Sequence, residues 1–173
     1  MSEAILVTRG LTKRYGAKPA AEDIELRLEK GQIYGLVGRN GAGKTTIIRM
    51  LTAQTPPTSG EIELFGETTE KGLSAARSRL GAMVEIPSFY PYLTAAENLE
   101  YYRRQRGIPG RDCVDRVLAQ VGLREAGKKK FKQFSLGMKQ RLGLALALMD
   151  NPDLLLLDEP INGLDPEGIV EFR

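Results

Sequence analysis

The amino-acid sequence predicts an α/β fold: a mixed sheet with helices, into which a helical subdomain is inserted. Three observations predict it. Short apolar runs typical of β-strands fill the first half of the chain and return near its end. A glycine-rich segment joins one of these runs to a helix. Residues 87–149, by contrast, show apolar residues at helical spacing and no strand pattern. We therefore expect a core of residues 1–86 and 150–173, with an antiparallel β part at its N-terminal end.

The composition is that of an ordinary globular protein. The 173 residues are 42% hydrophobic and 27% charged, enough for one domain with a sizeable core. The net charge of +3 would favour an anionic ligand but is too small to indicate nucleic-acid binding. Cys113 is the single cysteine, so a disulfide within the chain is impossible, which agrees with a reducing compartment. No apolar stretch reaches about 18 residues and no signal-peptide pattern is visible, so a membrane role would depend on a partner.

Apolar runs define the expected strands. Ile24, Leu26 and Leu28 alternate with charged residues, as in a half-exposed strand. The four leucines at 154–157 indicate a strand that is buried on both faces, as strands of a parallel sheet are. The expected strands are 5–8, 24–28, 33–37, 61–66, 80–84 and 154–157.

Capping residues mark the starts of the expected helices. Thr94 and Glu97 form a capping box, in which each side chain accepts a backbone N–H of the other residue. Ser135 has the hydroxyl that an N-cap position favours. The expected helices cover 94–106 and 114–121, and two more begin at Ser135 and at Asp165.

Residues 38–45, with the sequence GRNGAGKT, match the phosphate-binding pattern G-x-x-x-x-G-K-[ST] between an apolar run and a helix. Such a loop points its N–H groups inward, the helix start adds partial positive charge, and Lys44 adds a full one. The Thr45 hydroxyl would bind a magnesium ion that bridges the β- and γ-phosphates. The sequence thus predicts a P-loop NTPase core. The residues expected to contact the nucleotide here are Gly38, Asn40, Gly41, Ala42, Gly43, Lys44, Thr45 and Thr46.

Asp158 and Glu159 directly follow the leucine strand. Carboxylates at the C-terminal end of a buried strand face the crevice where phosphates bind in α/β folds. Asp158 would hold the magnesium ion, directly or through water, and Glu159 would polarise the water that attacks the γ-phosphate. The pair predicts hydrolysis of a nucleoside triphosphate.

With both motifs in place, the chain resembles the ATP-binding cassette (ABC) family over nearly its whole length. Residues 134–138, FSLGM, are similar to the family signature, usually L-S-G-G-Q, with leucine and methionine in place of the first glycine and the glutamine. The signature begins a helix, and a helix N-terminus is an anion site on physical grounds alone. The resemblance implies that Ser135 and Gly137 contact the γ-phosphate of ATP held by a second subunit.

Two further segments carry the same resemblance. Residues 161–166 are similar to the D-loop that crosses between paired subunits, and Tyr15 stands where the family stacks an aromatic ring on adenine. The implied cofactors are ATP and Mg²⁺. The implied partners are a second ATP-binding subunit, in a head-to-tail homodimer or heterodimer, and a membrane-spanning transporter subunit, with no nucleic acid. The protein is then expected in the cytoplasm, peripheral on the cytoplasmic face of the membrane.

Glu85 departs from the family, most of which has glutamine at this position. Our hypothesis is that Glu85 is a catalytic residue and magnesium-side ligand that couples the site to the helical subdomain. The alternative is a solvated acid at a strand end. Together with residues 87–91, Glu85 resembles the branch of the family that exports bacitracin-like and lantibiotic peptides.

Histidine is absent from the chain, whereas the family has a histidine that contacts the γ-phosphate, on a strand that would follow the last expected helix. That strand lies in mid-sheet in the family's fold, and without it two buried strands would have unpaired backbone groups. We therefore expect an N-terminal piece of a longer protein that lacks the C-terminal strands. By itself, this piece is expected to bind ATP but to hydrolyse it poorly.

As a whole, the sequence predicts a subunit that hydrolyses ATP to power an ABC transporter, an exporter of peptides or drugs. The aromatic residues Phe89, Tyr90 and Tyr92 are expected to form part of the surface for the membrane subunit. The basic run 128–132 is expected to be a solvated face, with contact to a membrane subunit or anionic lipid as the alternative. The alternative functions are an ABC ATPase that acts on ribosomes or DNA, and a nucleotide-binding fragment without turnover.

Overall fold

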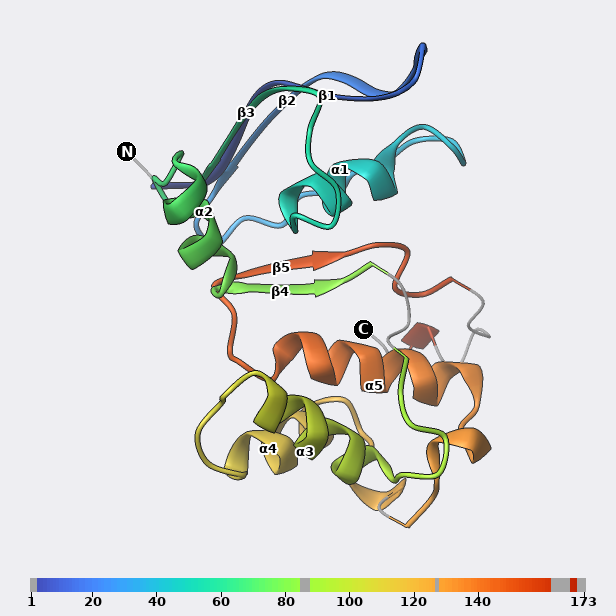
Figure 1. The fold of residues 1–173 in the computed structure, drawn as a ribbon. Coiled ribbons are helices and arrows are strands. Elements are labelled where there is room, and N and C mark those ends of the chain that lie inside the picture. Colours follow the sequence, from blue (N-terminus) through green and yellow to red (C-terminus); the bar gives the residue numbers. More distant parts are fainter. Residues whose placement is uncertain (1–2, 85–87, 127, 163–168, 171–173) are drawn as a thin grey trace. The chain divides into compact units, whose positions relative to one another are not determined.

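A computed structural model describes residues 3–84, 88–126, 128–162 and 169–170 of the chain. The chain divides into two compact units, residues 1–80 and 81–173 (Figure 1). The first unit contains the phosphate loop, and the second contains the predicted helical subdomain and the acidic pair. Each unit is described in turn.

The first unit is built on a three-stranded antiparallel sheet. Its strands are β1 (Ala4–Tyr15), β2 (Lys18–Glu29) and β3 (Ser59–Leu64), in the order β2-β1-β3. The predicted strands 5–8 and 24–28 fall within it, and the predicted strand 61–66 matches β3 except for residues 65–66, which form a turn. The first two are longer than predicted and form one hairpin that turns at Gly16, where φ is +61°. β2 and β3 pair with the two edges of the central strand, and its side chains Leu6 and Leu11 are buried.

Two helices complete the first unit, α1 (Lys44–Leu51) and α2 (Glu70–Arg77). Helix α1 contacts β2 and buries four apolar side chains, Ile47, Ile48, Met50 and Leu51. Helix α2 was not predicted, and Ala76 is its buried residue. Its N-cap is Thr69, whose hydroxyl accepts the N–H of Gly72 at 3.1 Å.

The prediction of a buried strand at 33–37 is wrong. Among the residues that the structure describes, neither sheet includes this segment. Ile33 is 103% exposed and Val37 is 94% exposed, so the apolar run is not covered by other side chains. Strand structure requires a neighbouring strand to pair with its N–H and C=O groups, and the described strands leave this run without one.

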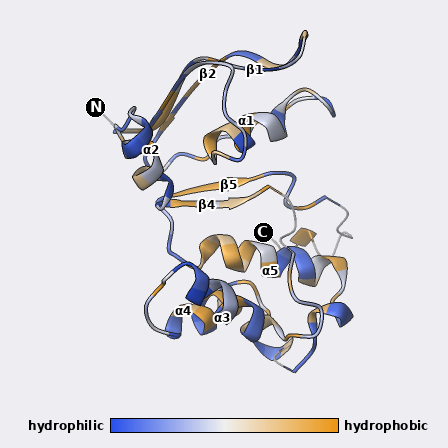
Figure 2. Ribbon diagram, viewed as in Figure 1, coloured by the Kyte–Doolittle hydropathy of each residue, from blue (hydrophilic) through white to orange (hydrophobic). Residues whose placement is uncertain are grey.

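The second unit combines two strands with a group of helices. The strands β4 (Leu80–Met83) and β5 (Leu154–Leu157) are neighbours and run in the same direction in Figure 1. Both are hydrophobic along their length (Figure 2). The helices are α3 (Ala95–Gln105), α4 (Asp112–Gln120) and α5 (Leu136–Leu148), with short 3₁₀ helices η1 (Arg124–Ala126) and η2 (Phe131–Gln133). The two predicted strands of this unit and three of its four predicted helices are confirmed.

The helices of the second unit share one hydrophobic core. Leu99 of α3, Val117 of α4, and Leu142 and Ala145 of α5 are all completely buried in it. Hydrophilic residues 139–141 lie in the first half of helix α5, and its second half is hydrophobic (Figure 2). Burial of several large side chains at about 1.5–3 kcal/mol each accounts for the association of these helices.

Phe89 belongs to this core and is 6% exposed, so its predicted place in an exposed aromatic surface is wrong. Its ring lies 5.7 Å from that of Tyr102 and 5.1 Å from that of Phe131, which makes it a packing residue. The exposed aromatic residues nearby are Tyr90, Tyr92 and Tyr101, at 44%, 67% and 43%. We call these three residues the tyrosine surface.

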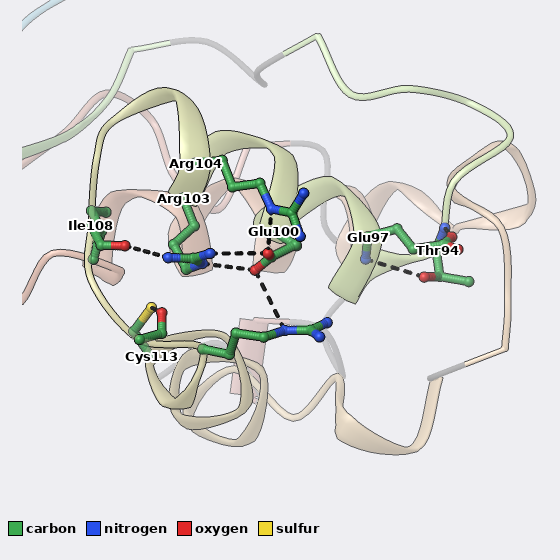
Figure 3. Close-up of polar contacts among 9 residues, drawn as sticks. Thr94, Glu97, Glu100, Arg103, Arg104, Ile108 and Cys113 are labelled. Atoms are coloured by element: carbon green, nitrogen blue, oxygen red, sulfur yellow. Dashed lines mark hydrogen bonds and ion pairs between the residues drawn. The ribbon is translucent and has the colours of Figure 1, made fainter.

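Charged side chains hold α3 in place at one end of this core (Figure 3). The carboxylate of Glu100 accepts hydrogen bonds from Arg103 Nε at 2.7 Å and from Arg104 Nε at 2.6 Å, and Arg111 Nε lies 3.8 Å away. The hydrogen bonds from Arg103 and Arg104 lower the pKa of Glu100 to about 2. Arg103 also donates to the carbonyl of Ile108, so this cluster fixes the chain where α3 ends.

Candidate nucleotide-binding site

Two glycines in left-handed backbone conformations shape the phosphate loop. Gly41 has φ +80° and Gly43 has φ +93°, a region that residues with a Cβ rarely adopt. A Cβ on Gly43 would lie 2.2 Å from the carbonyl oxygen of Ala20 in β2. The loop therefore closes directly against the β2 backbone, and position 43 requires glycine for both reasons.

Lys44, the first residue of α1, folds back over this loop. Its ammonium group donates to the carbonyl oxygens of Gly38 at 2.8 Å and Arg39 at 3.2 Å. The N-cap residue, Gly43, has no side chain to accept the first N–H groups of α1, and the first turn contains no acid. Helix dipole and lysine charge therefore act on the same loop, so the residues present fit an anionic phosphate group.

The other predicted residues of this motif lie on the same loop and helix start. Asn40, Gly41 and Ala42 are exposed, as a ligand-accepting loop requires. Thr45 and Thr46 are half-buried in the first turn of α1. The predicted phosphate-binding residues are thus gathered in one segment of the first unit.

Tyr15 ends β1 beside the hairpin turn and is 56% exposed. The ammonium of Lys13 lies 5.2 Å from the centre of its ring, within the range of a cation–π contact. The ring is open enough to stack on a base, and its role in adenine binding stays a prediction.

The predicted signature segment begins α5. Ser135 is the N-cap residue, and its hydroxyl accepts the backbone N–H of Met138 at 3.3 Å. Ser135 is exposed, and Leu136, in place of a glycine, is 46% exposed. The first turn of α5 carries no acid, so this helix start keeps its positive end open to an anion.

Asp158 and Glu159 follow β5 as predicted, and the two residues lie in different environments. The backbone N–H of Asp158 donates to the carbonyl of Met83 at 2.8 Å, which fixes Asp158 at the end of the two-stranded sheet. Glu159 is exposed and has φ +45°, a left-handed conformation that is unfavourable for a residue with a Cβ. Backbone strain of this kind concentrates at functional sites.

Two residues connect Glu159 to α5: Asn162, which the sequence placed in the predicted D-loop without this role, and Gln140, which sequence reasoning missed. The side-chain amide of Asn162 donates to the Glu159 carboxylate at 3.0 Å. Gln140, which is 5% exposed in α5, donates from its own side chain to the Asn162 carbonyl oxygen at 2.6 Å. In the sequence, the only hint of this contact is a glutamine close to the signature segment. Its burial and its partner 22 residues away are known from the structure.

The predicted site residues fall into two sets. Tyr15 and the phosphate loop lie in the first unit, and Ser135, Gly137, Asp158 and Glu159 lie in the second. The meeting of Lys44 and Asp158 at one nucleotide therefore stays a prediction. Glu85 and the D-loop residues from 163 onward, including the expected helix start at Asp165, lie outside the described residues.

A comparison with protein families decides the class. The family described as "ABC transporter" matches residues 21–162, a span that includes the phosphate loop, the α5 start and the acidic pair. The chain belongs to the ABC transporter family. The predicted resemblance and the predicted fold class are thereby confirmed.

Individual relatives agree with the family. The chain is 51% identical over 169 residues to the bacitracin transport ATP-binding protein BcrA of Bacillus licheniformis, covering 98% of this chain and 55% of the relative. It is 41% identical over 170 residues to the lantibiotic transport ATP-binding protein SrtF of Streptococcus pyogenes, covering 98% and 72%. The chain therefore spans little more than half the length of the first of these relatives.

The fold also matches solved ABC structures. A dimeric ATP-binding cassette in a post-hydrolysis state, bound to ADP and Pi, superimposes with a TM-score of 0.82 at 24% identity, covering 96% of this chain and 79% of that chain. In the described part of the chain, none of the helices has the length and hydropathy of a transmembrane span.

Proposed function

We propose that this chain binds ATP and, in the protein to which it belongs, hydrolyses it to drive an ABC exporter of peptides or drugs. The observation that carries the proposal is the phosphate loop: Gly43 closes it against β2, and Lys44 bends over it at the start of an α-helix. The resemblance to the bacitracin and lantibiotic transport proteins supports the export of peptides.

In this proposal the loop N–H groups, α1 and Lys44 bind the phosphates, and Tyr15 stacks on the adenine. Thr45 and Asp158 are the residues that would hold a magnesium ion. Among the described side chains, no group of three or more cysteines, aspartates or glutamates is arranged as a metal site, so phosphate oxygens would complete the ligand set. When bound, the ion would neutralise phosphate charge. Glu85 remains a candidate for the same set.

Glu159 is the proposed general base. It is exposed at the end of β5, and its carboxylate accepts a hydrogen bond from Asn162 that holds it in a defined orientation. A carboxylate so held would take a proton from the attacking water.

The proposed partners are a second ATP-binding subunit and a membrane-spanning subunit. The exposed Ser135 and the half-buried Gly137 at the α5 start would contact the γ-phosphate of ATP bound to the other subunit. The dimeric state of the fold relative bound to ADP and Pi supports this pairing. The helical residues 87–149 would act as a subdomain, with the tyrosine surface facing the membrane subunit.

The test is Glu159→Gln in the protein expressed from its own gene. We expect the ATP hydrolysis rate to fall about a hundredfold or more, as for loss of a general base, while the Kd for ATP stays within a factor of about two. Isothermal titration and phosphate release measure the two quantities. Wild-type protein that binds ATP but releases no phosphate would instead indicate a nucleotide-binding module, and Glu159→Gln protein with full activity would rule out Glu159 as the base.

A further inference from the structure

The side chains of Gln140 and Asn162 form a chain of hydrogen bonds from α5 to the proposed base. Gln140 donates to the Asn162 carbonyl at 2.6 Å, and the Asn162 amide donates to the Glu159 carboxylate at 3.0 Å. The backbone N–H of Asn162 also donates to the Glu159 carbonyl at 3.0 Å. Asn162 therefore holds both the main chain and the carboxylate of Glu159.

The anchor of this chain is a buried polar group. Gln140 is 5% exposed and lies in the first half of α5. The later turns of this helix fill the hydrophobic core. Its Oε1 atom receives no hydrogen bond within the described part of the chain. Burying an amide whose acceptor is unsatisfied is costly, so a leucine or methionine would serve packing alone better. The hydrogen bond from the Gln140 amide to the Asn162 carbonyl therefore explains why a glutamine stands at this position.

Glu159 needs such support because its backbone is left-handed. A residue with a Cβ at φ +45° is held there by its surroundings, and the direction of its carboxylate depends on the turn formed by residues 159–162. We propose that Asn162 and Gln140 are positioning residues for the hydrolytic carboxylate, which they link to the helix that begins with Ser135. This inference rests on the proposed function of Glu159.

The experiment uses the protein expressed from its own gene, with variants Asn162→Ala, Asn162→Asp and Gln140→Met. Asn162→Asp keeps the shape of the side chain but replaces the donor with a carboxylate that faces Glu159. We expect Asn162→Ala and Asn162→Asp to lower kcat about 10-fold to 100-fold, the range for losing a hydrogen bond to a charged group. Gln140→Met, which loses a hydrogen bond to a neutral backbone carbonyl, should lower kcat less, by about 3-fold to 10-fold. The Kd and KM for ATP should change less than about twofold, because neither residue lies on the phosphate loop. The matched control is Gln120→Met, which removes an exposed amide at the end of α4.

A double variant tests whether the two residues act as one unit. If Gln140 acts through Asn162, then Asn162→Ala with Gln140→Met should lower kcat by less than the product of the two single effects. Independent effects that multiply fully would overturn the link to α5. Unchanged kcat in Asn162→Ala and Asn162→Asp, alongside an inactive Glu159→Gln, would overturn the positioning role while leaving the proposed function standing.

A readout that needs no turnover completes the test. In the NMR spectrum, the side-chain amide signal of Asn162 should shift in Glu159→Gln, because its acceptor loses a full charge, and should not shift in Gln120→Met. An Asn162 signal that is the same in wild type and Glu159→Gln would overturn the inference whether or not the protein hydrolyses ATP.

Discussion

Helices α1 and α3 begin in opposite ways. At the start of α3, Thr94 and Glu97 satisfy each other: the Thr94 hydroxyl accepts the Glu97 N–H at 3.3 Å, and the Glu97 carboxylate accepts the Thr94 N–H at 2.7 Å. At the start of α1 the N-cap is Gly43, which has no side chain, and the only charge is that of Lys44. One helix start is closed by its own side chains, and the other is left for an anion.

The difference separates a structural helix start from a binding one. The first four N–H groups of any α-helix lack partners within the helix, and a capping side chain removes part of that deficit. The hydrogen bonds to the Thr94 backbone and side chain also lower the pKa of Glu97, so its charge is maintained where the helix dipole favours it. Changes at α3 should therefore affect stability, and changes at α1 should affect nucleotide binding.

The largest expected effect follows removal of the charge at α1. Lys44→Ala should weaken ATP binding by about 3 kcal/mol, roughly a hundredfold in Kd, because a cation next to the phosphates is lost. The thermal midpoint should stay nearly the same. Isothermal titration and thermal unfolding measure the two effects. Lys71→Ala, which removes an exposed lysine on α2, is the matched control, and ATP binding by Lys44→Ala as tight as in that control would contradict the assignment.

An intermediate effect is expected from the two hydroxyl caps. Thr94→Ala and Ser135→Ala should each lower the free energy of unfolding by about 1 kcal/mol, the usual value of an N-cap side chain. Only Ser135→Ala should also lower ATP hydrolysis, because Ser135 is proposed to contact nucleotide. Urea unfolding and phosphate release measure the two properties. Equal hydrolysis by both variants would place Ser135 with Thr94 as a purely structural cap.

The distance along the chain between interacting residues decides what the sequence could predict. Helix caps are local, so Thr94, Glu97 and Ser135 were recognised from a few neighbouring residues, as was the glycine pattern of the phosphate loop. Strand pairing is not local. Residues 33–37 have the composition of a strand, and no property of that run says which strand lies beside it.

The hydrogen bond from Gln140 to Asn162 was also beyond prediction. It joins residues 22 apart through a side chain and a backbone carbonyl, and neither residue belongs to a pattern that fixes the other. Phe89 was misassigned for a related reason. Its neighbours in sequence include exposed tyrosines, and its burial depends on Tyr102 and Phe131, which come from other elements. Local chemistry was therefore predicted better than long-range packing.

The smallest expected effect concerns the middle of α3 and depends on pH. Glu100 has a pKa of about 2 in the folded protein, below its ordinary value of 4.5, because Arg103 and Arg104 donate to its carboxylate. Since the folded-state pKa is the lower one, these hydrogen bonds stabilise the fold fully above about pH 4.5, and that contribution disappears as the pH falls toward 2. Glu100→Gln removes it at every pH.

Urea unfolding of wild type and Glu100→Gln at a series of pH values should therefore give curves that converge. The wild type should be the more stable at pH 7, and the difference should shrink between about pH 4.5 and pH 2. Glu125→Gln, which neutralises an exposed glutamate in η1, controls for the change in net charge. A constant difference across this range would mean that the carboxylate charge of Glu100 does not stabilise α3. ATP binding should not change in either variant, because the start of α3 is capped by its own side chains, whereas the start of α1 is the proposed phosphate site.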